Sequence, residues 1–292
     1  MRRFFPAIAV VSLMALMATG AWAQSYPVKP GRIIVPSAPG GGTDLIARLF
    51  AQKMSEAWGN AVVVDNQSGG ATTIGTNLVA KATPDGYTLL MTTANFAFVA
   101  ALYPKLPYDP VKDFSPITTV LIGPLLLVVN PKLPIKNIPD LLAYAKSTPG
   151  GLSYASSGSG QGSHLVGVMF NMQAKTELVH IPYKSQTAGL TDVISGQVGL
   201  MFDTPSTCMP HIQSGALRAL ATTRQKRFTP LPELPTIAEA GLPGYEVNTL
   251  YGAFAPAGFT SRMVGAKAVI VQGNSTLSFQ NTHYNVVGLG PT

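Results

Sequence analysis

The stretch RIIVPSAPGGGTDLIARLFAQKMSEAW, residues 32–58, decides the fold. Its apolar, β-branched start at 32–36 predicts a strand, and the glycines that follow predict a tight turn. From Asp44 to Trp58, apolar residues recur at helical spacing, which predicts a helix. A strand, a glycine-rich turn and a helix in this order are typical of the first unit of an α/β sheet.

Strand and helix patterns alternate outward from this unit. The first series continues with strands at 61–64 and 87–92 and a helix at 73–82. After a proline-rich passage at 103–116, a second series has helices at 138–147, 163–173, 188–195 and 206–214 and strands at 152–156, 178–182, 196–202 and 217–222. Alternation with short connections predicts parallel, doubly wound sheets. The two series therefore predict two lobes.

Two apolar segments lie where one series stops and the next begins. The run at 120–129 contains Gly123 and Pro124, so we interpret it as a buried strand and not as a membrane span. The other segment covers residues 245–254. Their positions make both segments candidate hinges between the lobes.

The first 23 residues have the layout of a secretory signal peptide. Arg2 and Arg3 precede an apolar run at 4–17, and Ala21-Trp22-Ala23 supplies a small-residue exit. Cleavage after Ala23 would leave a mature chain that starts at Gln24, with no cysteine there for lipid attachment. We therefore expect a soluble periplasmic protein, with a retained membrane anchor as the alternative.

Composition argues against several other classes of protein. Cys208 is the only cysteine, so no internal disulfide can form. Loss of Arg2 and Arg3 lowers the formal charge from +7 to +5, and the remaining basic residues are scattered, which argues against nucleic-acid binding. The four histidines are dispersed without a metal-ligand spacing, so we expect neither a metal nor a cofactor.

Two glycine-rich turns, PGGGTD at 39–44 and SSGSGQGSH at 156–164, each follow a strand and lead into a helix. Glycine lets a ligand approach the backbone, and the first N–H groups of a helix have no partner within the helix. Such a turn can hold an anion. One turn of this kind is weak support for a site, but two in separate lobes predict a carboxylate site in a shared cleft.

Catalytic motifs are not matched at either turn. No lysine follows the glycines as in a P-loop, and Ser163 stands where a dinucleotide fingerprint has its last glycine. No G-x-S-x-G surrounds Ser159, although a dyad of Ser159 with His164 keeps a periplasmic serine hydrolase open as an alternative. Asp203 follows an apolar strand and is either a ligand contact or a helix cap.

The chain resembles the Bug-type receptors of tripartite tricarboxylate transporters, also called TctC-like. The resemblance extends almost continuously from Tyr26 to Gly258. Its segments are YPVKP (26–30), IIVP (33–36), PGG (39–41), PDGYTLL (84–90), YD (108–109), HIPYK (180–184), GQV (196–198), RALA (218–221) and LPTIAEAG (234–241).

This resemblance implies a type II-like periplasmic-binding-protein fold, with two lobes that are each a doubly wound mixed sheet flanked by helices. Lobe 1 would comprise residues 24–123 and 247–292, and lobe 2 residues 124–246. It implies a monomeric, non-enzymatic receptor that encloses a di- or tricarboxylate, an aromatic acid or an acidic amino acid and delivers it to a membrane permease. A ligand-presenting partner of a sensor protein is an alternative with the same ligand chemistry.

The ligand contacts that follow from the two turns and from the resemblance are Gly41, Gly42, Thr43, Asp44, Thr93, Ser157, Ser159, Gln161, Ser163, His164, Tyr183 and Asp203. The chain departs from the family beyond Gly258. Family members continue there with a Leu- and Ala-rich helical segment, whereas residues 259–292 have neither a helical nor a strand period. We therefore expect an atypical tail and an incompletely packed lobe 1.

Overall fold

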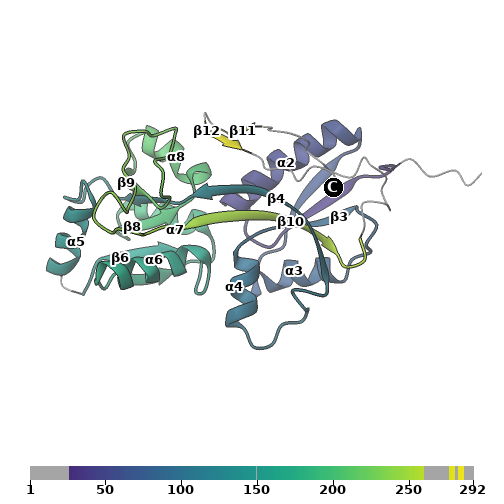
Figure 1. Cartoon of the computed structure of the whole chain (residues 1–292), viewed down its shortest axis with the longest axis horizontal. Coiled ribbons are helices and arrows are strands. Elements are labelled where there is room, and N and C mark those ends of the chain that lie inside the picture. The colour runs from purple at the N-terminus through teal and green to yellow at the C-terminus, as the bar shows by residue number, and fades with distance from the viewer. Residues whose placement is uncertain (1–25, 149, 260–275, 280–281, 286–292) are drawn as a thin grey trace, which may run out of the picture.

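Two five-stranded sheets flanked by helices form two lobes in the computed structural model (Figure 1). The structure describes residues 26–148, 150–259, 276–279 and 282–285. The predicted signal peptide and most of the predicted atypical tail lie outside the described residues. Within the described part, no helix has the length and apolar character needed to cross a bilayer.

The first sheet has the strand order β2-β1-β3-β10-β4. β1 pairs in parallel with β2 and β3, whereas β10 is antiparallel to both β3 and β4. Apolar side chains of β1 and of the first helix, among them Ile33, Phe50 and Met54, form its main core. The elements of this lobe are β1 (Gly31–Val35), α2 (Gly42–Trp58), β2 (Val62–Asn66), η1 (Gly70–Thr72), α3 (Thr73–Ala80), β3 (Thr88–Thr93), α4 (Asn95–Leu102), β4 (Phe114–Pro124) and β10 (Asn248–Pro256).

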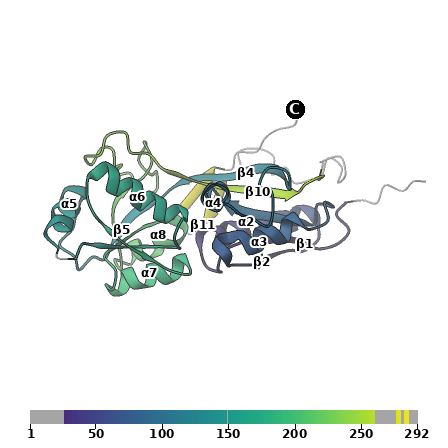
Figure 2. The same ribbon diagram turned by 90° about the horizontal axis from the view of Figure 1, so that it is seen from below.

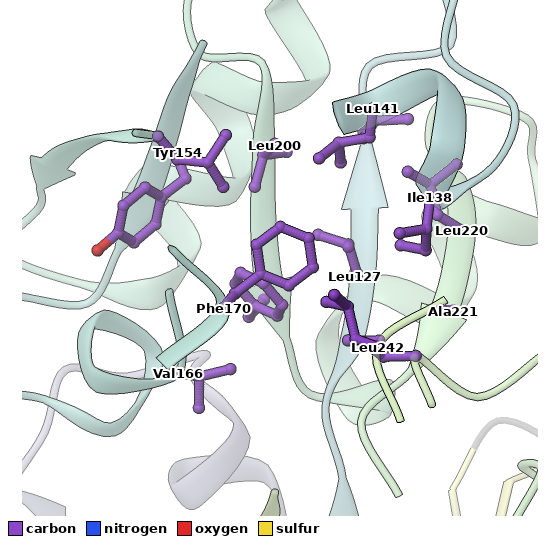
Figure 3. Close-up of a cluster of buried hydrophobic side chains, with 14 of the residues drawn as sticks. Leu127, Ile138, Leu141, Tyr154, Val166, Phe170, Leu200, Leu220, Ala221 and Leu242 are labelled. Atoms are coloured by element: carbon purple, nitrogen blue, oxygen red, sulfur yellow. The ribbon is translucent and has the colours of Figure 1, made fainter. Parts of the chain in front are cut away.

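The second sheet has the order β7-β6-β8-β5-β9. β6 is parallel to β7 and β8, and β5 is antiparallel to β8 and β9. Figure 3 shows part of its core, where Tyr154, Phe170 and Leu127 meet beside the sheet. The elements are β5 (Leu126–Val129), α5 (Ile138–Ser147), β6 (Ser153–Ser156), α6 (Gly162–Ala174), β7 (Val179–Pro182), α7 (Gln186–Ser195), β8 (Leu200–Asp203), α8 (Pro205–Gln213) and β9 (Arg218–Thr222).

The chain passes between the sheets twice, through Leu125 and through Val247. β4 and β10 are adjacent antiparallel strands in the first sheet and extend toward the second lobe (Figures 1 and 2). The alternating pattern predicted parallel sheets and the family resemblance implied mixed ones. The sheets are mixed, because β10 and β5 run antiparallel to their neighbours. Each of these strands enters its sheet from the other lobe, so its direction is set by the crossing and not by a βαβ connection.

Thr223 joins the two crossings. Its hydroxyl accepts from the Leu125 amide at 2.9 Å and donates to the Val247 carbonyl at 2.7 Å. Its backbone N–H donates to the Leu125 carbonyl at 3.0 Å, and its carbonyl accepts from the Val247 amide at 2.8 Å. The residue is fully buried. A single threonine therefore supplies four hydrogen bonds where the polypeptide passes between lobes.

Most predicted elements are present within a few residues of their predicted bounds. Helix α4 was not predicted, because its residues are apolar on every side and so have no helical period. Residues 120–129 were predicted as one strand, whereas β4 ends at Pro124 and β5 begins at Leu126. In the tail, β11 (Thr276–Phe279) and β12 (Thr282–Asn285) pair antiparallel, where no strand period was found.

Candidate ligand site

A cavity of about 710 Å³ lies between the lobes. Its walls are the turns at the N-terminal ends of helices: those before α2, α3 and α4 come from lobe 1, and those before α6 and α7 come from lobe 2. Among the described lining residues, Lys184 is the only charged one, and it is exposed. The polar surface of the cavity is thus made of backbone amides, hydroxyls and side-chain amides.

The first predicted turn forms one wall. Gly41 is the N-cap of α2 and has extended backbone torsions, so no side chain caps the helix from that position. At Gly42 an added Cβ would lie 2.6 Å from the Thr204 hydroxyl oxygen and 3.2 Å from the Ser206 hydroxyl oxygen, both in lobe 2. Only glycine allows the backbone of this turn to approach the opposite lobe so closely.

Asp44 supports this turn from behind. Its carboxylate accepts from the Gly40 amide at 2.9 Å and from Arg48 Nε at 3.0 Å. Burial acts to raise the pKa of Asp44, but the hydrogen bonds from Arg48 and Gly40 outweigh it, and the net pKa is lowered. Asp44 is therefore ionised, and its charge is balanced by Arg48.

The second predicted turn forms the facing wall. The Ser163 hydroxyl accepts from the Ser157 amide and lies 3.0 Å from the Ser157 hydroxyl, which folds the turn back on the start of α6. Gly158 and Gly160 have φ values of 132° and 75°, which a residue with a side chain rarely adopts. These glycines give the turn its shape.

Each of these helices receives a cap from the opposite lobe. Asn95 of α4, in lobe 1, accepts from the Gly162 amide of α6 at 2.8 Å. Gln186 of α7, in lobe 2, accepts from the Gly42 amide of α2 at 3.3 Å. Asn95 also donates to the Gln161 side chain. We call Asn95 and Gln186 the reciprocal caps, and they connect the lobes across the cavity.

Gln186 is held by residues at the end of β8 and the start of α8. Its amide group donates to Asp203, and the Thr207 hydroxyl donates to the same carboxylate at 2.8 Å. Burial raises the pKa of Asp203 to about 6, although the hydrogen bonds from Gln186 and Thr207 oppose that rise. Asp203 is fully buried and acts on the cavity through Gln186.

The structure brings most of the predicted contacts to the cavity. Those that line it are Gly41, Gly42, Thr43, Thr93, Ser157, Ser159, Gln161, Ser163 and Tyr183. Asp44, His164 and Asp203 are not among the lining residues and lie behind the turns. Asp44 and His164 each accept a hydrogen bond from a glycine amide of their own turn, whereas Asp203 accepts from the side chain of Gln186, which lines the cavity.

A third glycine-containing turn, residues 68–72, also lines the cavity and was missed. Gly69, Gly70, Ala71 and Thr72 all have positive φ values, from 53° to 128°. Positive φ is costly for Ala71 and Thr72 because they have a Cβ. The pair Gly69-Gly70, between a strand and a helix, was the feature of the sequence that could have predicted this turn. The reciprocal caps were missed as well, since they lie 67 and 144 residues from their partners.

A serine–histidine dyad is not formed. His164 Nδ1 accepts from the Gly160 amide at 3.1 Å, and no hydrogen bond among the described residues joins it to Ser159. No group of three or more potential metal ligands occurs among the described residues. Cys208 is buried, and burial raises the pKa of its thiol well above the usual value, which makes it a poor nucleophile.

Two α/β lobes joined by paired crossing strands around a cavity define the class of two-lobed solute-binding receptors. A family model described as the tripartite tricarboxylate transporter family receptor matches residues 46–275. Protein BugT of Bordetella pertussis is 34% identical over 266 residues, which cover 90% of this chain and 82% of BugT. The chain belongs to the tripartite tricarboxylate transporter receptor family.

Solved structures agree with this assignment. Rpa4515 of R. palustris, with adipate, has a TM-score of 0.79 and 37% identity, covering 82% of this chain and 81% of that chain. MatC (Rpa3494) of Rhodopseudomonas palustris, with bound malate, has a TM-score of 0.76 and 33% identity, covering 83% of each chain. Both likenesses extend over most of the two lobes.

Proposed function

We propose that this protein is a periplasmic receptor that captures a small carboxylate between its lobes and delivers it to a tripartite-type membrane permease. The observation that carries the proposal is the convergence of helix N-termini from both lobes on one cavity whose lining is almost free of charged side chains. Helix N-termini favour anions through unpaired N–H groups and the helix dipole. Rpa4515 with adipate and MatC with malate support a carboxylate as the ligand.

Neutral donors are sufficient for useful affinity. A carboxylate at a helix N-terminus gains about 0.3–2 kcal/mol from the dipole, and a hydrogen bond to a charged group contributes roughly 1.5–3 kcal/mol. Several such contacts reach the roughly 8 kcal/mol that correspond to a micromolar Kd. The predicted ligand contacts of both turns, Gly41 to Thr43 and Ser157 to Ser163, are the groups we propose for this role.

We also propose how the lobes act. Residues 24–123 and 247–292 form lobe 1, residues 124–246 form lobe 2, and the crossings at Leu125 and Val247 are the hinge. A ligand that contacts both turns favours the closed form by its differential affinity, and the closed form is what the permease recognises. The receptor acts as a monomer, uses no cofactor and is exported by the signal-peptide-like segment at 1–23.

Thermal-shift screening of the mature chain against adipate, malate, citrate, benzoate and glutamate tests the ligand class. A cognate acid at 100 times its Kd should stabilise the folded protein by about 2.7 kcal/mol, seen as a raised Tm. The matching amides, which lack the negative charge, serve as controls. The acid should be recovered chemically unchanged. Equal shifts with acids and amides, or conversion of the acid, would refute the proposal.

The reciprocal caps give a second expected result. Asn95→Ala and Gln186→Ala each remove a hydrogen bond between the lobes, and each should weaken carboxylate binding by roughly 2- to 13-fold. The closed fraction measured by small-angle scattering should fall in parallel. Gln225→Ala, at an exposed position, is the control and should leave both quantities unchanged. Unchanged affinity in both cap variants would show that closure does not depend on them.

A further inference from the structure

Two histidines lie against each other beneath the second turn. The rings of His164 on α6 and His180 on β7 are 4.0 Å apart between centroids, with their planes 31° apart. Tyr154 on β6 packs against His180 at 5.1 Å, and its hydroxyl donates to the His164 carbonyl at 3.3 Å. The pair is therefore fixed between a strand and a helix and does not reach the cavity as a ligand contact.

Each imidazole holds a different part of the turn. His164 Nδ1 accepts from the Gly160 amide at 3.1 Å. His180 Nε2 lies 2.5 Å from the hydroxyl of Ser156, and that hydroxyl also accepts from the Gly158 amide at 3.1 Å. The two glycines with positive φ, which shape the turn, are thus both connected to the histidines, Gly160 directly and Gly158 through Ser156.

This arrangement depends on the protonation state of the rings. His164 can accept from Gly160 only while Nδ1 carries no proton, so its neutral tautomer has the proton on Nε2. Two imidazolium rings in contact would repel each other, and none of the ion pairs between described residues includes either ring. Between Gly151 and Pro182 the other charged residues are Lys175 and Glu177, in the α6–β7 connection.

The neighbouring elements do not supply a counter-charge either. Among the described residues, the ring contacts of the pair are with Tyr154 on β6 and between the two rings themselves. On β8, which pairs with β6, the Asp203 carboxyl is engaged by Gln186 and Thr207. On α7, which packs on β6, Asp192 is engaged by the Tyr183 hydroxyl at 2.6 Å. α4, whose Leu102 approaches Gly160, contains no charged residue. A proton on either ring would therefore have no ion-pair partner among these groups.

We propose that His164 and His180 are positioning residues for the carboxylate turn and that they hold it in its binding shape only while both rings are neutral. The receptor then loses affinity for its ligand as the medium becomes acidic. This inference rests on the proposed carboxylate function and adds a pH limit to it. Neither histidine needs to touch the ligand.

The direction of the pH effect follows from the titration of the two rings. Burial, with the adjacent His164, lowers the pKa of His180 to about 4, and burial lowers the pKa of His164. A histidine with a depressed pKa supports the native turn above its ordinary pKa of about 6.5, and that support is lost as the pH falls toward the depressed value. The window for His180 is therefore from about 6.5 down to about 4.

The test compares adipate binding by calorimetry at pH 7.5 and pH 4.0, the lower end of the His180 window, in the wild type, His164→Asn and His180→Gln. Asn Oδ1 and a Gln side-chain amide can replace the ring nitrogens as hydrogen-bonding groups but do not titrate. The wild type should lose roughly 2- to 13-fold more affinity on acidification than either variant, which is the effect of one hydrogen bond. Protonation of adipate itself is common to all three proteins and cancels.

His164→Ala, which removes the acceptor, should bind weakly at both pH values, and His164→Asn should restore binding at pH 7.5. An equal pH dependence in the wild type and both amide variants would overturn the inference, as would tighter binding by the wild type at pH 4.0. A ligand-free measurement separates this inference from the proposed function. The protection factor of the Gly160 amide, which is its exchange rate relative to the intrinsic rate at the same pH, should fall as the NMR resonances of His164 and His180 titrate. A protection factor that does not follow this titration would also overturn the inference.

Discussion

A Gly42→Asp receptor is expected to bind its carboxylate at least about 100-fold more weakly than the wild type, a loss of ~2.7 kcal/mol. The new Cβ would lie 2.6 Å from the Thr204 hydroxyl oxygen and 3.2 Å from the Ser206 hydroxyl oxygen, both in the opposite lobe, so the lobes cannot close to the observed distance. The added carboxylate would also repel an anionic ligand. Calorimetry with the acid identified by thermal shift measures the loss.

Gly41 provides a matched control for the steric contribution to this loss of affinity. At Gly41 an added Cβ meets nothing closer than 3.6 Å, so Gly41→Ala should bind within a few-fold of the wild type. Gly42→Ala, with the same added atom one residue further on, should show a clear loss. Thr204 and Ser206 belong to the opposite lobe, whereas the Tyr251 hydroxyl, 3.0 Å from the added Cβ, belongs to the same lobe as Gly42, so the ligand-free Tm of each variant is measured alongside its affinity. Equal affinities for the two alanine variants would contradict the closure model.

The largest effect on stability is expected at Thr223. Thr223→Val keeps the shape of the side chain but leaves the Leu125 amide and the Val247 carbonyl without their hydroxyl partner. Each buried polar group left unpaired costs about 1–3 kcal/mol, so the free energy of unfolding should fall by about 2–6 kcal/mol. Urea unfolding measures the change.

Thr223→Ser keeps the hydroxyl and should lose only a methyl group, at a cost of roughly 1 kcal/mol. The comparison therefore isolates the hydrogen bonds at the crossings from the packing of the side chain. If valine and serine are equally destabilising, the hydroxyl has no special role. If valine alone lowers stability, the two passages of the chain are held together at this residue.

The sequence predicted the elements better than it predicted the contacts between lobes. The first and second turns were found because glycine, strand and helix signals are local: Gly40 to Gly42 and Gly158 to Gly160 each lie between a strand and a helix. Antiparallel placement of β10 was not predicted from the pattern, because strand direction in a sheet depends on a partner far along the chain.

Side-chain roles were harder to predict than backbone roles. Asp44 and His164 stand next to ligand turns in the sequence, yet each accepts a hydrogen bond from a glycine amide of its own turn. Asn95 and Gln186 carry no motif at all, and their partners are known only once the lobes are placed together. A local pattern reveals which backbone is exposed, whereas tertiary packing decides which side chain supports it.

The position of β10 has a consequence for the order in which the protein acquires structure. This strand lies between β3 and β4, so the first sheet stays divided until residues 248–256 arrive. The second sheet draws all its strands from one uninterrupted stretch, residues 126–222. Contacts between distant segments form slowly because loop closure costs entropy. The second sheet can therefore assemble early during refolding. The sheet of lobe 1 is completed only when β10 pairs between β3 and β4.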